Sequence, residues 1–480
     1  MANADAGSMQ PIICYDKHLN HCFGRKLPLR VLLVGAALAA APWPPALAEP
    51  AHPPYAIADT GQSRCYGPHG PIACPARPDE PFFGQDAQFR RHPQRYRDNG
   101  DGTVSDLVTG LMWEKQFGRA SFAEASRIAA ASRVGRHSDW RVPSIKELYS
   151  LISFDGATGS ARPETTGAPA DARPYLDTVA FAFEYPAQGR FIDAQYVTRT
   201  AYLGLTMGRD RSFFGVNFAD GRIKAYPQDG GPGGRVWYLR NVRGNPAYGV
   251  NDFADNGDGT VTDRATGLTW TRNDSGDPAF RPLMAATRQR DGRLDWGEAL
   301  AFCARLSLAG KTGWRLPDAK ELHSIVDYTR APDVTGSAAL DPIFGITAIA
   351  DDEGKRDWPF FWTSTSHLDG RVPGEFAVYI AFGRAQGHVR AGGAQNGERM
   401  GDRPPPPGGG RMGGPPPPGG PMMGRGPMMG AESGGILLDV HGAGAQRSSP
   451  KSGDESRLPK GAGPQGDILR IYNYARCVRG

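Results

Sequence analysis

The chain has 480 residues, a formal net charge of +5 and aromatic residues at 10%. At roughly 100–200 residues per domain, this length predicts two or three domains. Charge so near balance gives no whole-chain indication of nucleic-acid binding, so no nucleic-acid partner is expected. The basic residues are ten lysines and forty-five arginines. Coding bias explains this ratio; the alternative is a surface suited to carboxylate or sulfate groups, which arginine binds bidentately.

The first 48 residues have the pattern of a secretory signal region. Arg25–Arg30 is cationic, Val31–Ala41 is apolar, and Ala46-Leu47-Ala48 fits the small-x-small cleavage rule. The apolar run is too short to span a bilayer, which needs about 20 residues. We therefore expect residues 1–48 to be removed. The exported chain would then be periplasmic, at the cell surface or secreted, with no transmembrane segment.

A Pro-rich lead-in, residues 49–95, follows and contains two of the four remaining cysteines. Four cysteines allow three pairings. Cys65 and Cys74 bracket a short Pro/Gly loop that a local disulfide would close, which leaves Cys303 to pair with Cys477. An oxidising compartment makes both disulfides plausible. There is no CxxC pair and no histidine at ligand spacing, so we predict no zinc site and no other metal.

An eighteen-residue stretch occurs twice, as Asp98–Lys115 and as Asp255–Arg272, with twelve identical positions. Each copy is followed by a helix-like segment and then by Trp-Arg-x-Pro-x-x-Lys-Glu-Leu, which starts at Trp140 and at Trp314. Two units of this length with the same order of motifs indicate a duplicated domain. We call residues 96–245 the first copy and residues 253–480 the second copy.

In each copy the pattern predicts a hairpin, two helices and several short strands. Ser121 with Glu124, and Ser144 with Glu147, are typical of capping boxes at helix starts. For the first copy we predict a hairpin of Thr103–Asp106 and Leu111–Trp113, helices 121–132 and 144–152, and strands Gln195–Leu203, Phe213–Ala219 and Val236–Val242. For the second copy we predict helices Trp296–Ala309 and Ala319–Tyr328, strands Phe361–Ser366 and Ala377–Phe382, and a closing strand within Ile468–Val478.

Residues 392–435 are rich in Pro, Gly, Met and Arg and interrupt the second copy. Such a composition cannot bury a core, so we predict a disordered insertion. Its methionines would suit copper(I), although repeat expansion explains them equally well.

The repeated DNGDGT resembles the start of an EF-hand calcium loop. With Gly102 at loop position six, Arg97 and Val108 take the places of two essential acidic ligands, and the second copy has alanine at both places. An EF-hand is therefore excluded, and a looser calcium site built partly from other loops is the alternative. We interpret the motif as turn chemistry, with Asp98, Gly102, Asp255 and Gly259 as structural residues.

The Trp-Arg-x-Pro motif is also interpreted structurally: Trp fills the core, Pro sets the start of the next helix and Glu caps it. No His, Cys or Ser stands at matching places in both copies, and no hydrolase, P-loop or dinucleotide fingerprint is present. We therefore expect no catalytic residue and no cofactor. The structural residues are Trp113, Trp140, Pro143, Glu147, Trp270, Trp314, Pro317 and Glu321.

Together, DNGDGTVxDxxTGLxW, WR[VL]PxxKEL, the aromatic-x-Thr-x-[ST] strand and the closing strand resemble the Lcl C-terminal domain family, named after a collagen-like bacterial adhesin. The resemblance covers about Tyr96–Asn245 and Phe253–Arg479. It implies an α+β class with two tandem C-type lectin-like domains, each of two helices and small antiparallel sheets. In that fold a disulfide ties the first helix to the last strand, as Cys303 and Cys477 would.

The resemblance does not by itself imply sugar binding. Calcium-dependent lectins of this fold use Glu-Pro-Asn or Gln-Pro-Asp and Trp-Asn-Asp, and neither copy contains them. We therefore expect an exported, non-enzymatic adhesion protein that recognises an anionic or sulfated polysaccharide without calcium. The alternative is a structural scaffold of the cell envelope that binds a protein partner through residues 392–435. Candidate ligand-binding residues are Arg281, Arg288, Arg290, Arg293, Arg384 and Arg390.

Overall fold

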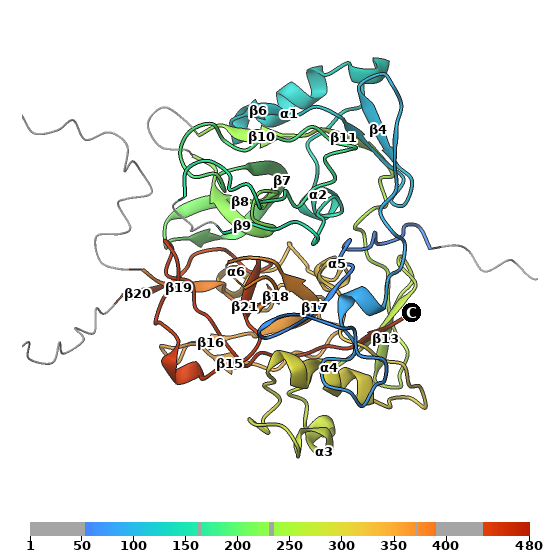
Figure 1. Ribbon diagram of the computed structural model, residues 1–480, viewed down its shortest axis with the longest axis vertical. Helices are drawn as coiled ribbons and strands as arrows, with labels where there is room; N and C mark the ends of the chain where they lie inside the picture. Colours follow the sequence, from blue (N-terminus) through green and yellow to red (C-terminus); the bar gives the residue numbers. More distant parts are fainter. Residues whose placement is uncertain (1–52, 161–164, 230–234, 371, 390–434) are drawn as a thin grey trace, which may run out of the picture. The chain divides into compact units, whose positions relative to one another are not determined.

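The structure, a computed structural model, describes residues 53–160, 165–229, 235–370, 372–389 and 435–480. The proposed signal region, the predicted insertion up to residue 434 and Arg390 therefore lie outside the described residues. The described part is a mixed α+β structure, mostly strands in small sheets with few short helices (Figure 1). This confirms the predicted class, and the C-type lectin-like fold remains an expectation.

The repeated hairpin builds a four-stranded antiparallel sheet in each copy, and the last strand of that copy completes the sheet. Alternate residues of the hairpin are buried, so Trp113 and Trp270 lie in the core. The strands of the first copy are β3 (Tyr96–Asp98), β4 (Thr103–Asp106), β5 (Leu111–Glu114) and β11 (Val242–Gly244); those of the second are β12 (Phe253–Asp255), β13 (Thr260–Asp263), β14 (Leu268–Thr271) and β22 (Val478–Arg479).

The DNGDGT motif forms its own turn in both copies. The Asp98 carboxylate accepts the N–H of Gly100 at 3.0 Å, and Asp255 accepts the N–H of Gly257 at 2.9 Å. Gly102 and Gly259 have φ angles of +87° and +86°, which favour glycine. The carboxylates are therefore hydrogen-bonded within the turn that they shape.

The four predicted helices are present, and three of them end earlier than predicted. They are α1 (Phe122–Ala131), α2 (Ile145–Tyr149), α4 (Trp296–Arg305) and α5 (Ala319–Ser324). The apolar residues after α2 and α5 form β-bridges instead of further helical turns, as Ile152 does with Leu176 and Val326 with Leu340. After α4, Leu306 has an extended backbone. The sequence did not predict α3 (Arg281–Met284) and α6 (Pro332–Thr335), nor the 3-10 helices η1 (Asp86–Gln88), η2 (Val134–Arg136), η3 (Pro278–Phe280) and η5 (Glu455–Arg457).

One eight-stranded sheet contains strands of both copies. The two parts meet where β21 pairs with β9, with Gln446 opposite Ile223. The order is β17 (Phe360–His367), β18 (Phe376–Ala381), β21 (Gln446–Pro450), β9 (Arg222–Pro227), β8 (Asp210–Asn217), β7 (Gln195–Thr206), β10 (Trp237–Leu239) and β6 (Gly118–Ala120). The predicted strand Val236–Val242 is therefore two strands in different sheets, β10 and β11. Buried Arg240 lies between them in the chain, and its guanidinium donates to the carbonyls of Glu114 and Ala182.

The lysines of the repeated motif join the two copies reciprocally. Lys146 Nζ donates to the Ser324 carbonyl at 2.7 Å, and Lys320 Nζ donates to the Ser150 carbonyl at 2.8 Å. Each lysine comes from the motif helix of one copy and reaches the end of the motif helix of the other. Burial lowers the pKa of both lysines to about 8.

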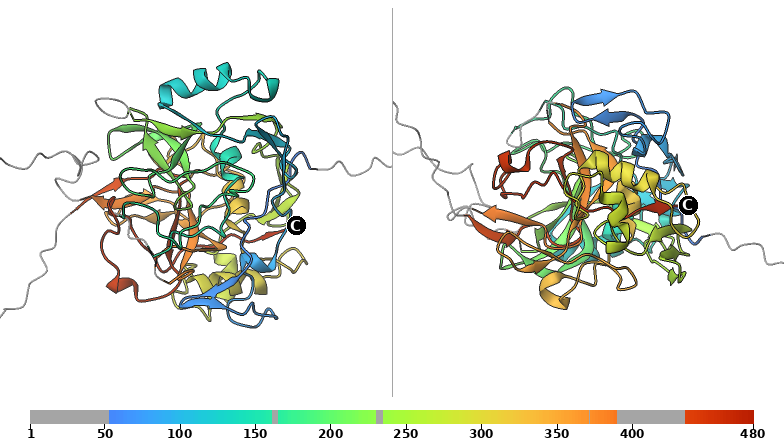
Figure 2. Two further views of the ribbon diagram at one scale, coloured as in Figure 1. Left: turned by 45° about the horizontal axis from the view of Figure 1, so that its top comes forward. Right: turned by 90° about the horizontal axis from the view of Figure 1, so that it is seen from below.

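The lead-in packs on the second copy, beside α4 and β17 (Figures 1 and 2). Gln62 exchanges two hydrogen bonds with the backbone of Ser366, and buried Asp86 accepts from Thr60 and Thr365. The structure contains the disulfides Cys65–Cys74 and Cys303–Cys477. Three further hairpins are β1 (Cys65–Gly67) with β2 (Gly70–Ile72), β15 (Ile349–Ala350) with β16 (Arg356–Asp357), and β19 (Gln386–Val389) with β20 (Ile436–Asp439).

Candidate functional site

The repeated WRxPxxKEL motif has a structural role that its pattern predicts only in part. Glu147 and Glu321 complete capping boxes, as predicted, and each also accepts hydrogen bonds from the arginine of its own motif, Arg141 or Arg315. Arg315 donates to both Glu321 oxygens at 2.5 and 2.6 Å. Burial favours the neutral acid, but the Arg315 guanidinium outweighs it and lowers the pKa of Glu321. The charges of Arg315 and Glu321 therefore neutralise each other within the motif.

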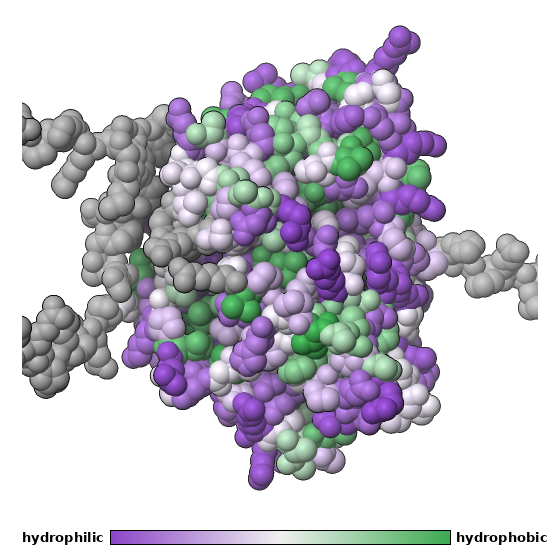
Figure 3. Space-filling model, viewed as in Figure 1, coloured by the Kyte–Doolittle hydropathy of each residue, from purple (hydrophilic) through white to green (hydrophobic). Residues whose placement is uncertain are grey.

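The face of the molecule in Figure 3 mixes hydrophilic and hydrophobic side chains. Apolar groups are scattered over the described residues of this face, so it does not present a continuous apolar area that would mark a protein interface. A concave site is the better candidate for ligand binding.

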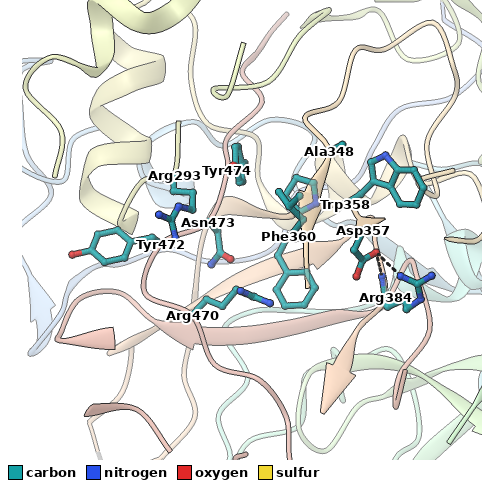
Figure 4. A pocket seen from close by; sticks show the side chains of 13 residues that line it. Arg293, Ala348, Asp357, Trp358, Phe360, Arg384, Arg470, Tyr472, Asn473 and Tyr474 are labelled. Carbon is teal, nitrogen blue, oxygen red and sulfur yellow. Dashed lines mark hydrogen bonds and ion pairs between the residues drawn. The ribbon is translucent and has the colours of Figure 1, made fainter. Parts of the chain in front are cut away.

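A pocket of about 290 Å³ lies in the second copy. Its wall is formed by β16, the start of β17, the loop before α4 and the C-terminal segment Arg470–Tyr474. Figure 4 shows the side chains that line it, and those that matter most below are Arg293, Trp358, Phe360, Arg470, Tyr472 and Asn473.

Backbone pairing on both sides holds the C-terminal segment in place. Leu294 and Asn473 exchange N–H···O bonds of 2.8 and 3.0 Å, and Tyr474 N–H donates to the Phe360 carbonyl at 3.1 Å. Cys477, four residues beyond Asn473, is bonded to Cys303 of α4. The segment is therefore fixed to α4 and to β17, which makes the pocket wall part of the folded core.

Asn473 is the least expected residue of the pocket. Its exposed fraction is 2%, yet neither Nδ2 nor Oδ1 has a hydrogen-bond partner among the described residues. A buried, unpaired amide costs roughly 1–3 kcal/mol, so folded proteins rarely keep one without a reason. Asn473 lines the pocket, but both amide atoms are closed off from solvent, so its side chain has to turn toward the pocket before a ligand with polar groups supplies the partners.

Arg293 and Arg470 lie at the same end of the pocket as Asn473 (Figure 4). Arg293 pairs with Asp291 at 2.9 Å, and Arg470 is 3.8 Å from Asp352; all four side chains are at least a quarter exposed. Exposed ion pairs of this kind contribute about 0–1 kcal/mol, so both guanidinium groups can exchange these partners for a ligand anion. Arg470 also lies 5.4 Å above the centre of the Phe360 ring.

The opposite end of the pocket is charge-balanced. Arg384 is 5% exposed, and its guanidinium donates to both carboxylate oxygens of Asp333. The backbone N–H of Arg384 donates to the Asp357 carboxylate at 3.0 Å. Hydrogen bonds from Arg384 lower the pKa of Asp333 to about 2. Burial raises the pKa of Asp357 to about 6 despite the hydrogen bonds that its carboxylate accepts. Arg384 thus supports the pocket wall, with its donors already used.

The six arginines predicted as ligand residues are not all brought together. Arg293 and Arg384 line the pocket. Arg288 is exposed and does not line the pocket, and a hydrogen bond with Tyr472 raises the pKa of its guanidinium. Arg281, at the first position of α3, and Arg290 are exposed and do not line the pocket. Arg390 lies outside the described residues.

A scan against family models matches the Lcl C-terminal domain to residues 102–242 and 259–398, more than half of the chain. The chain belongs to the Lcl C-terminal domain family. No curated protein and no solved structure matched the chain. The second Lcl match ends at residue 398, whereas the structure closes the second Lcl domain with β22, beyond the predicted insertion. The C-terminal segment that lines the pocket therefore lies beyond that match.

The two Lcl domains differ at the pocket. Backbone pairing shows which residues are equivalent. Trp237 pairs with Ala120 in the first domain as Asn473 pairs with Leu294 in the second. Tyr238 pairs with Tyr196 as Tyr474 pairs with Phe361, so Trp237 is the equivalent of Asn473. Trp237 is 1% exposed and fills the position that Asn473 holds in the second domain.

The neighbouring wall differs as well. Tyr196 of β7 corresponds to Phe361 of β17. Asp193 precedes Tyr196 by as many residues as Trp358 precedes Phe361, so Asp193 takes the place of Trp358 in the first domain. Asp193 is bound by Arg190 at 2.6 Å and by Gln195 at 3.0 Å. At the position of the pocket, the first domain therefore has the buried Trp237 side chain and the Arg190–Asp193 ion pair.

Sequence reasoning missed Arg470, Asn473, Trp358 and Phe360, which are far apart in the chain. One signal was present: the closing segment Ile471-Tyr472-Asn473-Tyr474 places a polar residue where the first copy has Trp237. The family match suggests an adhesin-like protein. The two disulfides are consistent with export, and the part of the chain that the structure describes has no helix long and apolar enough to cross a membrane.

Proposed function

We propose that this protein is an exported, non-enzymatic adhesin that binds an anionic polysaccharide without calcium, through the pocket of its second Lcl domain. The observation that carries the proposal is the meeting of two partly exposed guanidinium groups, Arg293 and Arg470, with the unpaired amide of Asn473. Guanidinium groups bind carboxylate and sulfate groups through paired hydrogen bonds. Phe360 and Trp358 also line the pocket, but at 5% and 6% exposed they add only a small apolar contact area.

Calcium plays no part in this proposal. The acidic side chains of the DNGDGT turns are hydrogen-bonded within those turns, and Asp357, the carboxylate that lines the pocket, is bound by Arg384. Recognition therefore depends on arginine and amide donors. It should weaken as salt rises, because salt screens attraction between exposed charges.

The test is binding of the mature chain to an array of neutral, carboxylated and sulfated glycans, with and without a calcium chelator. Saturable, salt-sensitive binding to acidic glycans that survives chelation is expected. Binding that requires calcium, or equal binding to neutral glycans, would contradict the proposal.

A deletion separates this function from a scaffold role of the predicted insertion. Val389 and Ile436 are register partners at the end of the β19–β20 hairpin, so an Asn-Gly turn can replace residues 390–435 between them. The shortened chain should keep the glycan affinity of the full chain. Loss of glycan binding in a folded deletion variant would instead assign recognition to residues 390–435, which include Arg390 as well as the insertion.

A further inference from the structure

The pocket has two chemically different ends. At one end, Arg293, Arg470 and Asn473 offer hydrogen-bond donors, and the pocket lining there contains no carboxylate. At the other end, Asp357 is paired with Arg384, whose charge is also neutralised by Asp333. Arg293 and Arg470 are paired as well, with Asp291 and Asp352, but these carboxylates are 47% and 44% exposed and do not line the pocket. An anionic group can therefore replace them at the first end, whereas the donors of Arg384 at the second end are already used. A ligand would bind in one orientation.

The size of the pocket restricts what fits. Pockets for drug-sized ligands measure about 300–1,000 Å³, and this one, at about 290 Å³, is at the lower limit. It can hold a single sugar ring, and the rest of a polymer would have to lie outside. Phe360 lies between the two ends (Figure 4). It is 5% exposed, its ring stacks on Tyr379 with centres 4.7 Å apart, and the Arg470 guanidinium lies 5.4 Å from the ring centre, so Phe360 holds Arg470 in place and contributes little open surface.

Resting on the function proposed above, we infer that the pocket takes one pyranose ring with a single anionic substituent, and that the described residues of the two domains form one such site. The substituent, a carboxylate or a sulfate, lies between Arg293, Arg470 and the Asn473 amide. The ring occupies the pocket volume between the two ends. Its hydroxyl groups face the charge-balanced end at Asp357.

The restriction to one site follows from the first domain. Buried Trp237 fills the position of Asn473 there, and Asp193 is already bound by Arg190 and Gln195. A second sugar ring could enter only by displacing a core tryptophan. Duplication of the domain has therefore not duplicated the site, and the first domain supports the second through their shared sheet.

The experiment is calorimetric titration of the mature, full-length chain with glucuronate, glucose 6-sulfate and glucose in the presence of a chelator. At least one of the two acidic sugars should bind with a stoichiometry of one per chain. Glucose should bind at least tenfold more weakly. The comparison of the two acids identifies the anion that the site prefers.

Two pocket variants and one matched control complete the test. Arg470→Gln and Asn473→Leu should each weaken binding of the preferred acidic sugar at least tenfold. Arg305→Gln removes the same charge from an exposed position at the end of α4, outside the pocket, and should change affinity less than twofold. Thermal unfolding of each variant shows whether it is folded.

The outcomes separate this inference from the proposed function. If acidic polysaccharide binds but neither acidic sugar does, or if two sugars bind per chain, the single-ring site is wrong and polysaccharide recognition stands. If Arg470→Gln and Arg305→Gln weaken binding equally, attraction is general and the pocket has no special role. If no acidic polysaccharide binds, both the function and the site are refuted.

Discussion

Replacing Asn473 with leucine should make the free protein more stable while weakening ligand binding at least tenfold. Asn473 is 2% exposed and both of its amide atoms lack hydrogen-bond partners among the described residues. Leucine has a similar outline and no polar group to satisfy, and the backbone bonds to Leu294 remain. Leaving a buried polar group unpaired costs roughly 1–3 kcal/mol. We therefore expect the free energy of unfolding to rise by about 1–2 kcal/mol, after allowance for imperfect packing of the larger side chain.

Asn217 is the matched control, because it is equally buried but fully hydrogen-bonded. Its exposed fraction is 2%, its Nδ2 donates to the Ile192 carbonyl at 2.6 Å, and its Oδ1 accepts the N–H of Ala219 at 3.0 Å. Asn217→Leu leaves those two backbone groups unpaired and should lower the free energy of unfolding by about 2 kcal/mol or more. Urea unfolding with intact disulfides measures both variants. If Asn473→Leu destabilises the chain as Asn217→Leu does, the Asn473 amide has a structural partner and the reasoning fails.

Two further predictions concern the disulfides and the lysines that join the copies. The Cys303–Cys477 bond spans 174 residues and the Cys65–Cys74 bond spans 9. By the loop-entropy model, replacing the first pair with serine should lower the free energy of unfolding by about 5 kcal/mol, and replacing the second pair should lower it by about 3 kcal/mol. Urea unfolding measures both losses, and equal losses would contradict the prediction. Burial lowers the pKa of Lys320 to about 8, so between pH 8 and 10 the unfolded chain binds more protons than the folded chain and stability rises with pH. Lys320→Met should remove up to about 3 kcal/mol of that rise, and an unchanged pH profile would refute it.

The elements near the repeated motifs were predictable from local chemistry. The capping-box pattern of Ser144 and Glu147 predicts the start of α2, and the glycines of DNGDGT predict a turn. The ends of helices were less predictable, because tertiary pairing decided them: Ile152 and Val326 continue a helical pattern in sequence but form bridges with distant residues.

Contacts between the copies could not be read from either copy alone. The pairing of β9 with β21 joins residues more than two hundred positions apart, and the lysine of each motif finds its acceptor in the other copy. In sequence, Lys146 and Lys320 look like solvent-exposed helix residues. Their burial follows from duplication, which places two equal helices against each other.

The candidate site was predictable only in its chemistry. The lack of calcium-lectin tripeptides and the family resemblance led to the prediction of arginine-based binding, and Arg293, one of the predicted residues, lines the pocket. Arg384, chosen for its place after β18, proves to be held by Asp333 and Asp357, which lie 51 and 27 residues earlier in the chain. Asn473 became visible as a site residue only when the fold placed it beside Arg470 with no partner.

The most direct test of this account compares the binding of a uronate-containing polysaccharide to the wild-type chain, Arg470→Gln and Arg305→Gln, in the presence of a chelator. We predict saturable binding by the wild type and by Arg305→Gln, and binding at least tenfold weaker by Arg470→Gln. Equal affinity of all three folded proteins, or binding that appears only when calcium is restored, would contradict the pocket as the recognition site.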